Sequence, residues 1–343
     1  EIGTSLITAS VAELTNLLEE YRLTEIEQSV AEKNKTYTLT DKERKEAEQY
    51  LKAPNLIART KEDIGKSGVV GEDDNRLLMY LIFTSRKQER PLHIVSLGAS
   101  GTGKTHLQEK VGELIPEEDK LEMTSLSENA FYYFERTELS HKLILIEDLD
   151  GAENVLYPLR ELQSKKRISK TIVHKNSQGQ TRSINLEVEG PVCVAGCTTK
   201  EQIYEDNANR SFLIYLDESE AQDEKIMEYQ RAMSAGSIDR ASELKVAELL
   251  RNTQRILQPI KVVNPYAELL QLPKAVFKPR RTNAHYLHFI EAVTFYSQFQ
   301  REKKYDKQTG EEFIETTLED IEEANKLMKE VLLRKSDELT GAC

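Results

Sequence analysis

Cysteine is scarce in this sequence, which has three among its 343 residues: Cys193, Cys197 and the C-terminal Cys343. None of them has a partner at the spacing of paired metal ligands, and together they form no repeated pattern. A zinc scaffold and a disulfide framework are therefore excluded. Cys193 and Cys197 are four apart on a predicted strand, where they face the same side at a separation too long for a disulfide. We expect both in the core.

Long hydrophobic runs are also lacking. The longest, LLMYLIF at residues 77–83, is far shorter than the roughly 18 residues that a membrane span requires. No signal-peptide pattern opens the chain, and there is neither an internal repeat nor a low-complexity linker. These absences predict a cytoplasmic protein that does not contact a membrane.

The charge and the length indicate a soluble protein with a real core. Lys and Arg number 47 against 59 Asp and Glu, which gives a formal charge of -12, and charged residues make up 31% of the chain. The length predicts about two domains at roughly 150 residues each. The sequence begins with Glu1 and stops after a charged helical pattern, so we expect it to be a piece of a longer protein.

The hydrophobic pattern divides the chain into three parts. Residues 1–60 form a helical N-terminal segment, with apolar residues at helical spacing such as Leu14, Leu17 and Leu18. In residues 61–217, short apolar runs (HIVSL, KLILI, PVCVA and FLIYL) alternate with helical segments. This alternation predicts an α/β domain with a largely parallel sheet. Residues 218–343 are predicted to be helical again.

A complete G-x-x-x-x-G-K-[ST] motif follows the apolar run at residues 93–97 and precedes a helical pattern, which is the context that a phosphate-binding loop requires. Its residues are Gly98, Ala99, Ser100, Gly101, Thr102, Gly103, Lys104 and Thr105. The backbone N–H groups would cradle phosphates at the start of the helix. Lys104 would reach the β- and γ-phosphates, and the Thr105 hydroxyl would bind Mg2+. The motif predicts ATP and Mg2+ as cofactors; the alternative is a glycine-rich turn that only joins strand to helix.

An acidic pair, Glu147 and Asp148, ends the apolar strand LILI. A phosphate site needs such carboxylates to hold the metal and to orient water. The usual order is Asp for the metal and then Glu for the water, and here that order is inverted. By position, Glu147 would lie at the metal and Asp148 would polarise the attacking water. Asp150 is a third candidate, and an acidic loop without a catalytic role is the alternative.

The order of these motifs resembles that of an AAA+ ATPase, and within that superfamily the MCM helicase branch. Four further stretches carry the likeness: GVVGEDDNR at residues 68–76 followed by LLMYLIF, LRELQSKKRISK at 159–170, AGCTT at 195–199, and NRSF at 209–212. The resemblance implies an AAA+ P-loop core with a helical lid. It also implies that Thr198 acts as sensor 1, bonding the γ-phosphate or the attacking water. It further implies that Arg210 is an arginine finger acting on a neighbouring subunit, and that Arg281, with Arg280 as the fallback, is the sensor 2 arginine.

Two departures from the MCM pattern refine the resemblance. No long insertion lies between Glu122 and His141, and no N-terminal oligonucleotide-binding barrel is present. The chain is therefore most similar to the compact, self-loading MCM-like replicative helicases of mobile elements, for which a primase is an expected partner. A winged helix would follow Cys343 if the resemblance extends further.

Basic residues concentrate between Arg160 and Arg182, where the only acid is Glu161. The segment 168–188 is predicted to form two strands around the turn residues 176–179, with Lys175 near the tip. In the MCM pattern this is the pre-sensor 1 hairpin, which projects into the ring pore and contacts the DNA backbone. We assign DNA binding to Lys170, His174, Lys175 and Arg182; the alternative is a solvated basic hairpin on an outer face.

The function expected from these observations is that of an ATP-driven, hexameric DNA helicase that translocates on single-stranded DNA in replication of its host or of a mobile element. An AAA+ protein remodeller or chelatase-type motor would share every nucleotide-binding residue. A nucleotide switch that loads another helicase or regulates transposition is a third hypothesis. His285 and His288 have no third ligand at metal-binding spacing, so we expect them to pack or to lie at the surface.

Overall fold

The computed structural model describes residues 13, 14, 17, 18, 21, 37–124, 127, 129–150, 156–175, 181–199, 210–273, 276 and 278–340, without the side chains of 174, 175, 182, 330 and 332–340. The chain divides into two units, Glu1–Leu39 and Thr40–Cys343. In the first unit residues 13, 14, 17, 18 and 21 are helical, and the side chains of Leu14, Leu17, Leu18 and Tyr21 are exposed.

The second unit is built on a parallel five-stranded sheet with the order β2-β3-β6-β1-β7. Its strands are β1 (Ile94–Leu97), β2 (Lys120–Met123), β3 (Lys142–Ile146), β6 (Val192–Thr198) and β7 (Phe212–Tyr215). All residues of β1 and β6 are buried, which is typical of a parallel sheet that is covered on both faces. The expected α/β P-loop core is confirmed.

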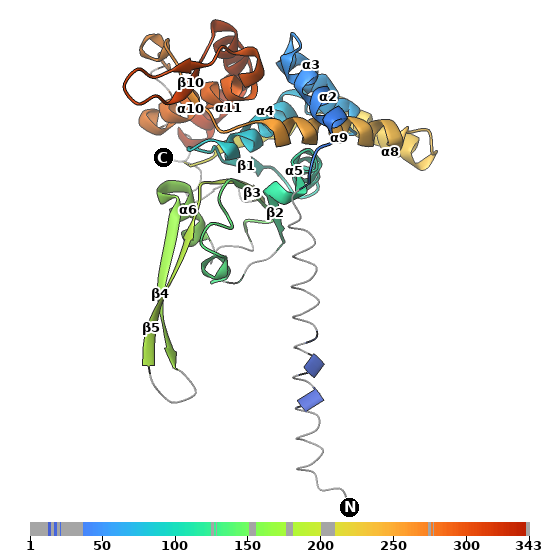
Figure 1. The fold of residues 1–343 in the computed structure, drawn as a ribbon. Helices are drawn as coiled ribbons and strands as arrows, with labels where there is room; N and C mark the ends of the chain where they lie inside the picture. Colours follow the sequence, from blue (N-terminus) through green and yellow to red (C-terminus); the bar gives the residue numbers. More distant parts are fainter. Residues whose placement is uncertain are drawn as a thin grey trace, which may run out of the picture. The chain divides into compact units, whose positions relative to one another are not determined.

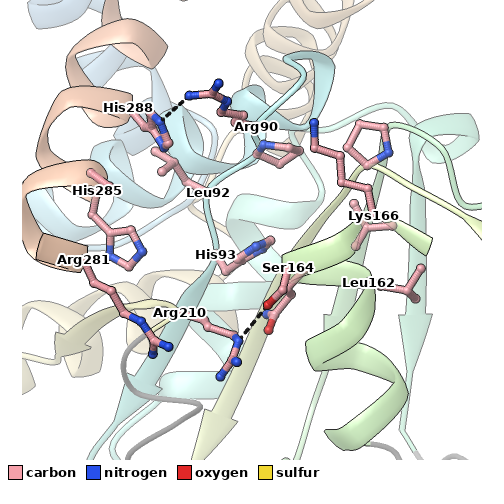
Figure 2. A pocket seen from close by; sticks show the side chains of 15 residues that line it. Arg90, Leu92, His93, Leu162, Ser164, Lys166, Arg210, Arg281, His285 and His288 are labelled. Carbon is pink, nitrogen blue, oxygen red and sulfur yellow. Dashed lines mark hydrogen bonds between the residues drawn. The ribbon is translucent and has the colours of Figure 1, made fainter. Parts of the chain in front are cut away.

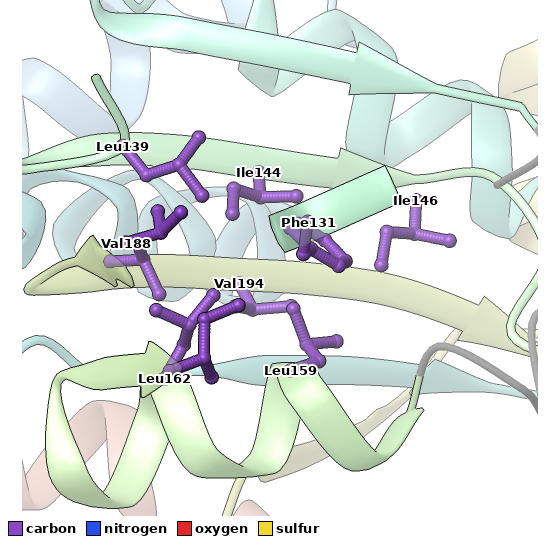
Figure 3. Packing of buried hydrophobic residues seen from close by; sticks show 10 residues of the cluster. Phe131, Leu139, Ile144, Ile146, Leu159, Leu162, Val188 and Val194 are labelled. Carbon is purple, nitrogen blue, oxygen red and sulfur yellow. The ribbon is translucent and has the colours of Figure 1, made fainter. Parts of the chain in front are cut away.

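The alternating side chains of β3 show how the two faces are covered. Ile144 and Ile146 pack in a buried cluster with Leu159 and Leu162 of α6 (Leu156–Lys165) (Figure 3). Leu145 points to the other face, where its side chain leaves no room for a Cβ atom on Gly112 of α5 (Lys104–Gly112). The apolar run KLILI is therefore continuous because both faces of this strand are buried.

Within the second unit, three α-helices precede the sheet: α2 (Asp41–Lys52), α3 (Leu56–Lys66) and α4 (Asp73–Thr84). Helix α2 begins with a complete capping box between Thr40 and Glu43, which satisfies two backbone donors at the helix start. In α4 the whole run from Leu77 to Phe83 is at most 2% exposed, so the longest apolar stretch of the sequence is a core helix.

A β-hairpin is inserted between α6 and β6, and we call it the arm. Its strands, β4 (Arg167–Lys175) and β5 (Thr181–Glu189), pair antiparallel from Arg167↔Glu189 to Lys175↔Thr181, as predicted. Ile168 and Val188 at its base are buried in the core cluster, whereas Val173 is 68% exposed. Figure 1 shows the arm extending away from the five-stranded sheet.

The C-terminal part contains the expected helices and a small sheet that the hydrophobic pattern did not indicate. The helices are α8 (Glu220–Ser234), α9 (Arg240–Ile256), α10 (Pro279–Tyr296) and α11 (Leu318–Thr340). The sheet has the order β8-β10-β9 and comprises β8 (Lys261–Val263), β9 (Lys304–Tyr305) and β10 (Glu312–Glu315). Within the described part of the chain, no helix is both long and apolar enough to cross a membrane.

Candidate nucleotide-binding site

The phosphate-loop motif joins the end of β1 to the start of α5. Gly98, Gly101 and Gly103 all have positive φ angles, of 151°, 88° and 90°, which residues with a Cβ atom rarely adopt. Gly103 is the N-cap of α5, so the backbone of the loop lies at the positive end of the helix dipole. The sequence therefore forms an anion cradle at this point.

Lys104 is the first residue of α5 and is only 6% exposed. Its Nζ atom donates hydrogen bonds to the carbonyl oxygens of Gly98, at 2.7 Å, and of Ala99. The ammonium group thus lies over the loop that would hold the phosphates. A phosphate oxygen in the cradle would compete with these two carbonyls for its protons.

The acidic pair follows β3, the second neighbour of β1 in the sheet. Glu147 accepts a hydrogen bond of 3.1 Å from the hydroxyl of Thr124, which follows β2. The Oδ1 atom of Asp148 accepts one of 2.8 Å from the backbone N–H of Asp150. These contacts fix the loop after β3 while both carboxylates line one cavity.

Thr198 ends β6, the strand that lies between β1 and β3. Its hydroxyl donates a 2.5 Å hydrogen bond to Oδ1 of Asp150. The other oxygen, Oδ2, accepts hydrogen bonds from the backbone N–H and the hydroxyl of Thr199, at 3.0 and 2.9 Å. One carboxylate therefore ties the loop after β3 to the end of β6.

These groups surround a single cavity of about 350 Å3. Its lining includes Lys104, Thr105, Glu147, Asp148 and Thr198, five of the seven residues predicted to be catalytic or metal-binding. The donor set suits a magnesium nucleotide: backbone N–H groups and an ammonium for the phosphates, and hydroxyl and carboxylate oxygens for a hard cation. When bound, magnesium would neutralise phosphate charge beside Thr105, Glu147 and Asp148.

Cys197 forms part of the cavity wall and is 3% exposed. Burial raises the pKa of its thiol to about 11. The thiol donates to Oε1 of Gln108, whose Nε2 atom donates to the carbonyl oxygen of Ile146. Cys193 is also buried, and neither is in a disulfide, so the prediction that both belong to the core is confirmed.

Arg210 and Arg281 do not reach this cavity. They line a second one of about 490 Å3, together with Arg90 and Lys166 (Figure 2). We call it the cationic cavity.

The histidines near this cavity are mostly engaged in packing. His285 stacks on Phe212 with ring centroids 5.3 Å apart, and His288 lies 3.5 Å from Arg90. Burial, and then the charge of Arg210, lower the pKa of His93 to about 3. His93 instead accepts a 3.3 Å hydrogen bond from the backbone N–H of Val194. It is therefore a neutral core residue beside the arginines.

The two cavities lie at opposite edges of the sheet. The phosphate loop follows the C-terminal end of β1, whereas Arg210 precedes β7, whose first residue pairs with the first residue of β1. Four strand residues at about 3.3 Å each separate the two edges by about 13 Å. The cavities share no lining residue.

The predicted DNA-binding residues all belong to the arm. Lys170 donates to Oδ1 of Asn129 and lies 5.4 Å from the ring centroid of Tyr132, so it braces the arm against the preceding segment. The side chains of His174, Lys175 and Arg182 lie outside the described residues, as does the predicted turn at 176–179.

Sequence reasoning missed the partners of the predicted residues. Asp150 was considered only as an alternative carboxylate, whereas it holds both threonines. Arg90 was not singled out, because an arginine in a polar loop has no distinguishing spacing. The Thr-Thr pair after a buried strand was the available signal for a hydrogen-bonding site at the end of β6.

Comparison with known proteins identifies the domain. Residues 38–259 match the family model described as the MTBMA_p00010 P-loop domain. An uncharacterised protein of this name from Methanothermobacter marburgensis is 25% identical over 286 residues, which cover 77% of this chain and 33% of that protein. This chain thus spans about a third of the length of its relative.

Proposed function

Because the chain belongs to the MTBMA_p00010 P-loop domain family, we propose that it hydrolyses ATP and that hydrolysis drives a ring-forming DNA helicase of the MCM-like type. In this proposal the ring translocates on single-stranded DNA in replication of the host or of a mobile element. The nucleotide, the neighbouring copy and the DNA each contact a different part of the domain.

The nucleotide half of the proposal assigns one role to each residue of the first cavity. Lys104 and the loop N–H groups bind the phosphates, and Thr105 and Glu147 hold magnesium. Asp148 accepts the proton of the attacking water. Thr198 bonds the γ-phosphate or the attacking water. The convergence of all five on one cavity supports this assignment.

The observation that carries the oligomer is the placement of the two arginines. Arg210 and Arg281 come together in the cationic cavity, at the edge of the sheet opposite the phosphate loop. The nucleotide cavity of the same copy lies at the opposite edge of the sheet, so these two arginines would instead act on the exposed triphosphate of a second copy. Hydrolysis then requires a neighbouring copy. In a closed ring every copy has such a neighbour, and the proteins that this chain resembles form hexameric rings.

The arm supports DNA as the substrate. It is a two-stranded ribbon that extends from the core, and its sequence is basic although the chain carries a net charge of -12. In a ring, arms from all copies would bring positive charge to one channel. Contacts of this kind bind the phosphate backbone without sequence preference and weaken with salt.

The experiment that tests the proposal is the steady-state ATPase rate with and without single-stranded DNA, at two salt concentrations, with Lys104→Ala as the control. We expect a Lys104-dependent rate that DNA stimulates and that salt suppresses. A Lys104-dependent rate that is indifferent to DNA would refute the helicase and favour the remodeller or the nucleotide switch. No Lys104-dependent rate at all would refute the enzyme.

A further inference from the structure

The carboxylate of Asp150 accepts three hydrogen bonds from the two threonines at the end of β6. It accepts the Thr198 hydroxyl on Oδ1 and both the backbone N–H and the hydroxyl of Thr199 on Oδ2. Asp150 does not line the first cavity, whereas Thr198 and Thr199 do. Asp150 therefore acts on that cavity through its neighbours.

A threonine hydroxyl has one proton to donate and two lone pairs that accept. In Thr198 that proton is directed to Asp150 at 2.5 Å, a charge-assisted bond that is stronger than one between neutral groups. While this bond persists, the hydroxyl oxygen can accept a hydrogen bond from a group in the cavity but cannot donate one. The Thr198 oxygen can therefore accept a hydrogen bond from a water molecule. It cannot form one with a phosphate oxygen, which has no proton to donate.

We propose that Asp150 is a positioning residue that fixes the polarity of Thr198, so that Thr198 orients the attacking water and does not bond the γ-phosphate. The inference rests on the proposed ATPase function. The water oxygen forms the new bond to phosphorus as the bond to the leaving ADP oxygen breaks. The proton of the water passes to Asp148, and Thr198 keeps its own.

The substitution Asp150→Asn reverses the direction of the hydrogen bond between residue 150 and Thr198, and the new side chain has almost the same shape as the old one. The backbone N–H of Thr199 can only donate, so the amide oxygen of the new side chain must occupy the Oδ2 position. The amide NH2 then faces Thr198 and donates to its hydroxyl. The Thr198 proton is released toward the cavity, where it favours the γ-phosphate over the water.

The affinities for three complexes separate the two polarities without relying on turnover. The first ligand is ADP alone. The second is ADP with beryllium fluoride, which mimics the bound γ-phosphate. The third is ADP with aluminium fluoride, which mimics the phosphoryl group under attack by water. For Asp150→Asn we expect unchanged ADP affinity, equal or tighter beryllium fluoride binding, and aluminium fluoride binding and kcat both lowered about 100-fold.

Control variants distinguish positioning from general damage. Thr198→Ser keeps the hydroxyl and should retain nearly the kcat of the unmodified protein, whereas Thr198→Val should lose as much as Asp150→Asn. The double variant Asp150→Asn/Thr198→Val should lose no more than either single change, since both act on one hydrogen bond.

Two results would overturn the inference. One is a kcat for Asp150→Asn within about threefold of the unmodified protein. The other is an equal loss of beryllium and aluminium fluoride binding in Thr198→Val, which would mean that Thr198 donates to the γ-phosphate. Either can occur while Lys104-dependent hydrolysis persists, so failure of the inference is distinguishable from failure of the proposed function.

Discussion

The Nε atom of Arg210 donates a hydrogen bond of 2.9 Å to the hydroxyl of Ser164, the next-to-last residue of α6. This contact holds the arginine at the cationic cavity, on the side of the sheet away from its own phosphate loop. The relationship gives the proposed assembly its sharpest test, because each active site would combine residues of two copies.

We predict that Arg210→Ala lowers the ATPase rate about 1,000-fold and leaves ATP affinity unchanged, because the arginine would act only on the neighbour's transition state. Mixing Arg210→Ala with the equally inactive Lys104→Ala should restore part of the rate, because some mixed interfaces join an intact phosphate loop to an intact arginine. Arg231→Ala, which removes an exposed arginine of α8, is the matched control. A mixture as inactive as its components would contradict a shared site.

The arm predicts a separation of ATP binding from DNA stimulation. Lys175→Ala should leave ATP binding intact and weaken the stimulation of turnover by single-stranded DNA. The slope of log affinity against log salt should fall by about one, since one phosphate contact is lost. The exposed Lys45 of α2 provides the control substitution. Equal stimulation of Lys175→Ala and unmodified protein would exclude the arm from DNA binding.

Arg86 and Asp119 form a core ion pair of 2.5 Å in which the arginine is fully buried. Arg86→Ala should lower the free energy of unfolding by about 3 kcal/mol, the low end for a broken buried pair because Asp119 retains access to water. Lys42→Ala, which breaks an exposed pair with Glu46, should change it by less than about 0.5 kcal/mol. Urea unfolding measures both, and similar values would contradict the prediction.

The same pair predicts a loss of stability in acid. Burial raises the pKa of Asp119, but the charge and hydrogen bond of Arg86 outweigh burial and hold that pKa below its ordinary value. The unfolded chain therefore takes up a proton first, so this stabilisation is present above about pH 4 and is lost as pH falls below it. Arg86→Ala should flatten the stability curve in that range, and an unchanged curve would argue against the pair.

We expect His93 to cause a second pH dependence of the free energy of unfolding, at higher pH than that of Asp119. The pKa of His93 is about 3 in the folded protein and about 6.5 when unfolded, so below pH 6.5 only the unfolded chain is protonated there. Stability from this residue is complete above about pH 6.5 and is lost progressively as the pH falls from there toward about pH 3. Urea unfolding of His93→Gln between pH 7 and 5 should show a shallower slope, and parallel curves would contradict this.

The fold of the core could be predicted because its strands are short, apolar and separated by strong turn or helix signals. The runs at β1, β3, β6 and β7 were each found. Edge strand β2 escaped because KLEM has only two apolar residues and Glu122 is exposed. The β8-β10-β9 sheet escaped for a similar reason, since strands of two to four residues give too few alternations to stand out from helical surroundings.

The first cavity could be predicted residue by residue because a phosphate loop and a strand-end carboxylate have fixed positions relative to their strands. What the sequence could not give is the pairing of side chains across elements. The Thr198–Asp150 bond joins residues 48 positions apart, and nothing in either local pattern specifies it. Such a contact depends on the sheet order, which places β6 between β1 and β3.

That sheet order also gives the arm a mechanical property. The arm leaves the core through α6 and returns directly into β6, the strand that ends at Thr198 and lies beside the strand that carries the acidic pair. Nine residues per strand at about 3.3 Å each make a lever about 30 Å long, so a tilt of about 10° at its base displaces the far end by about 5 Å. One end of this lever is continuous with β6, whose last residue lines the nucleotide cavity, and the other with α6, which lines the cationic cavity, so a sub-ångström adjustment at the base of the arm becomes a displacement of several ångströms at its far end.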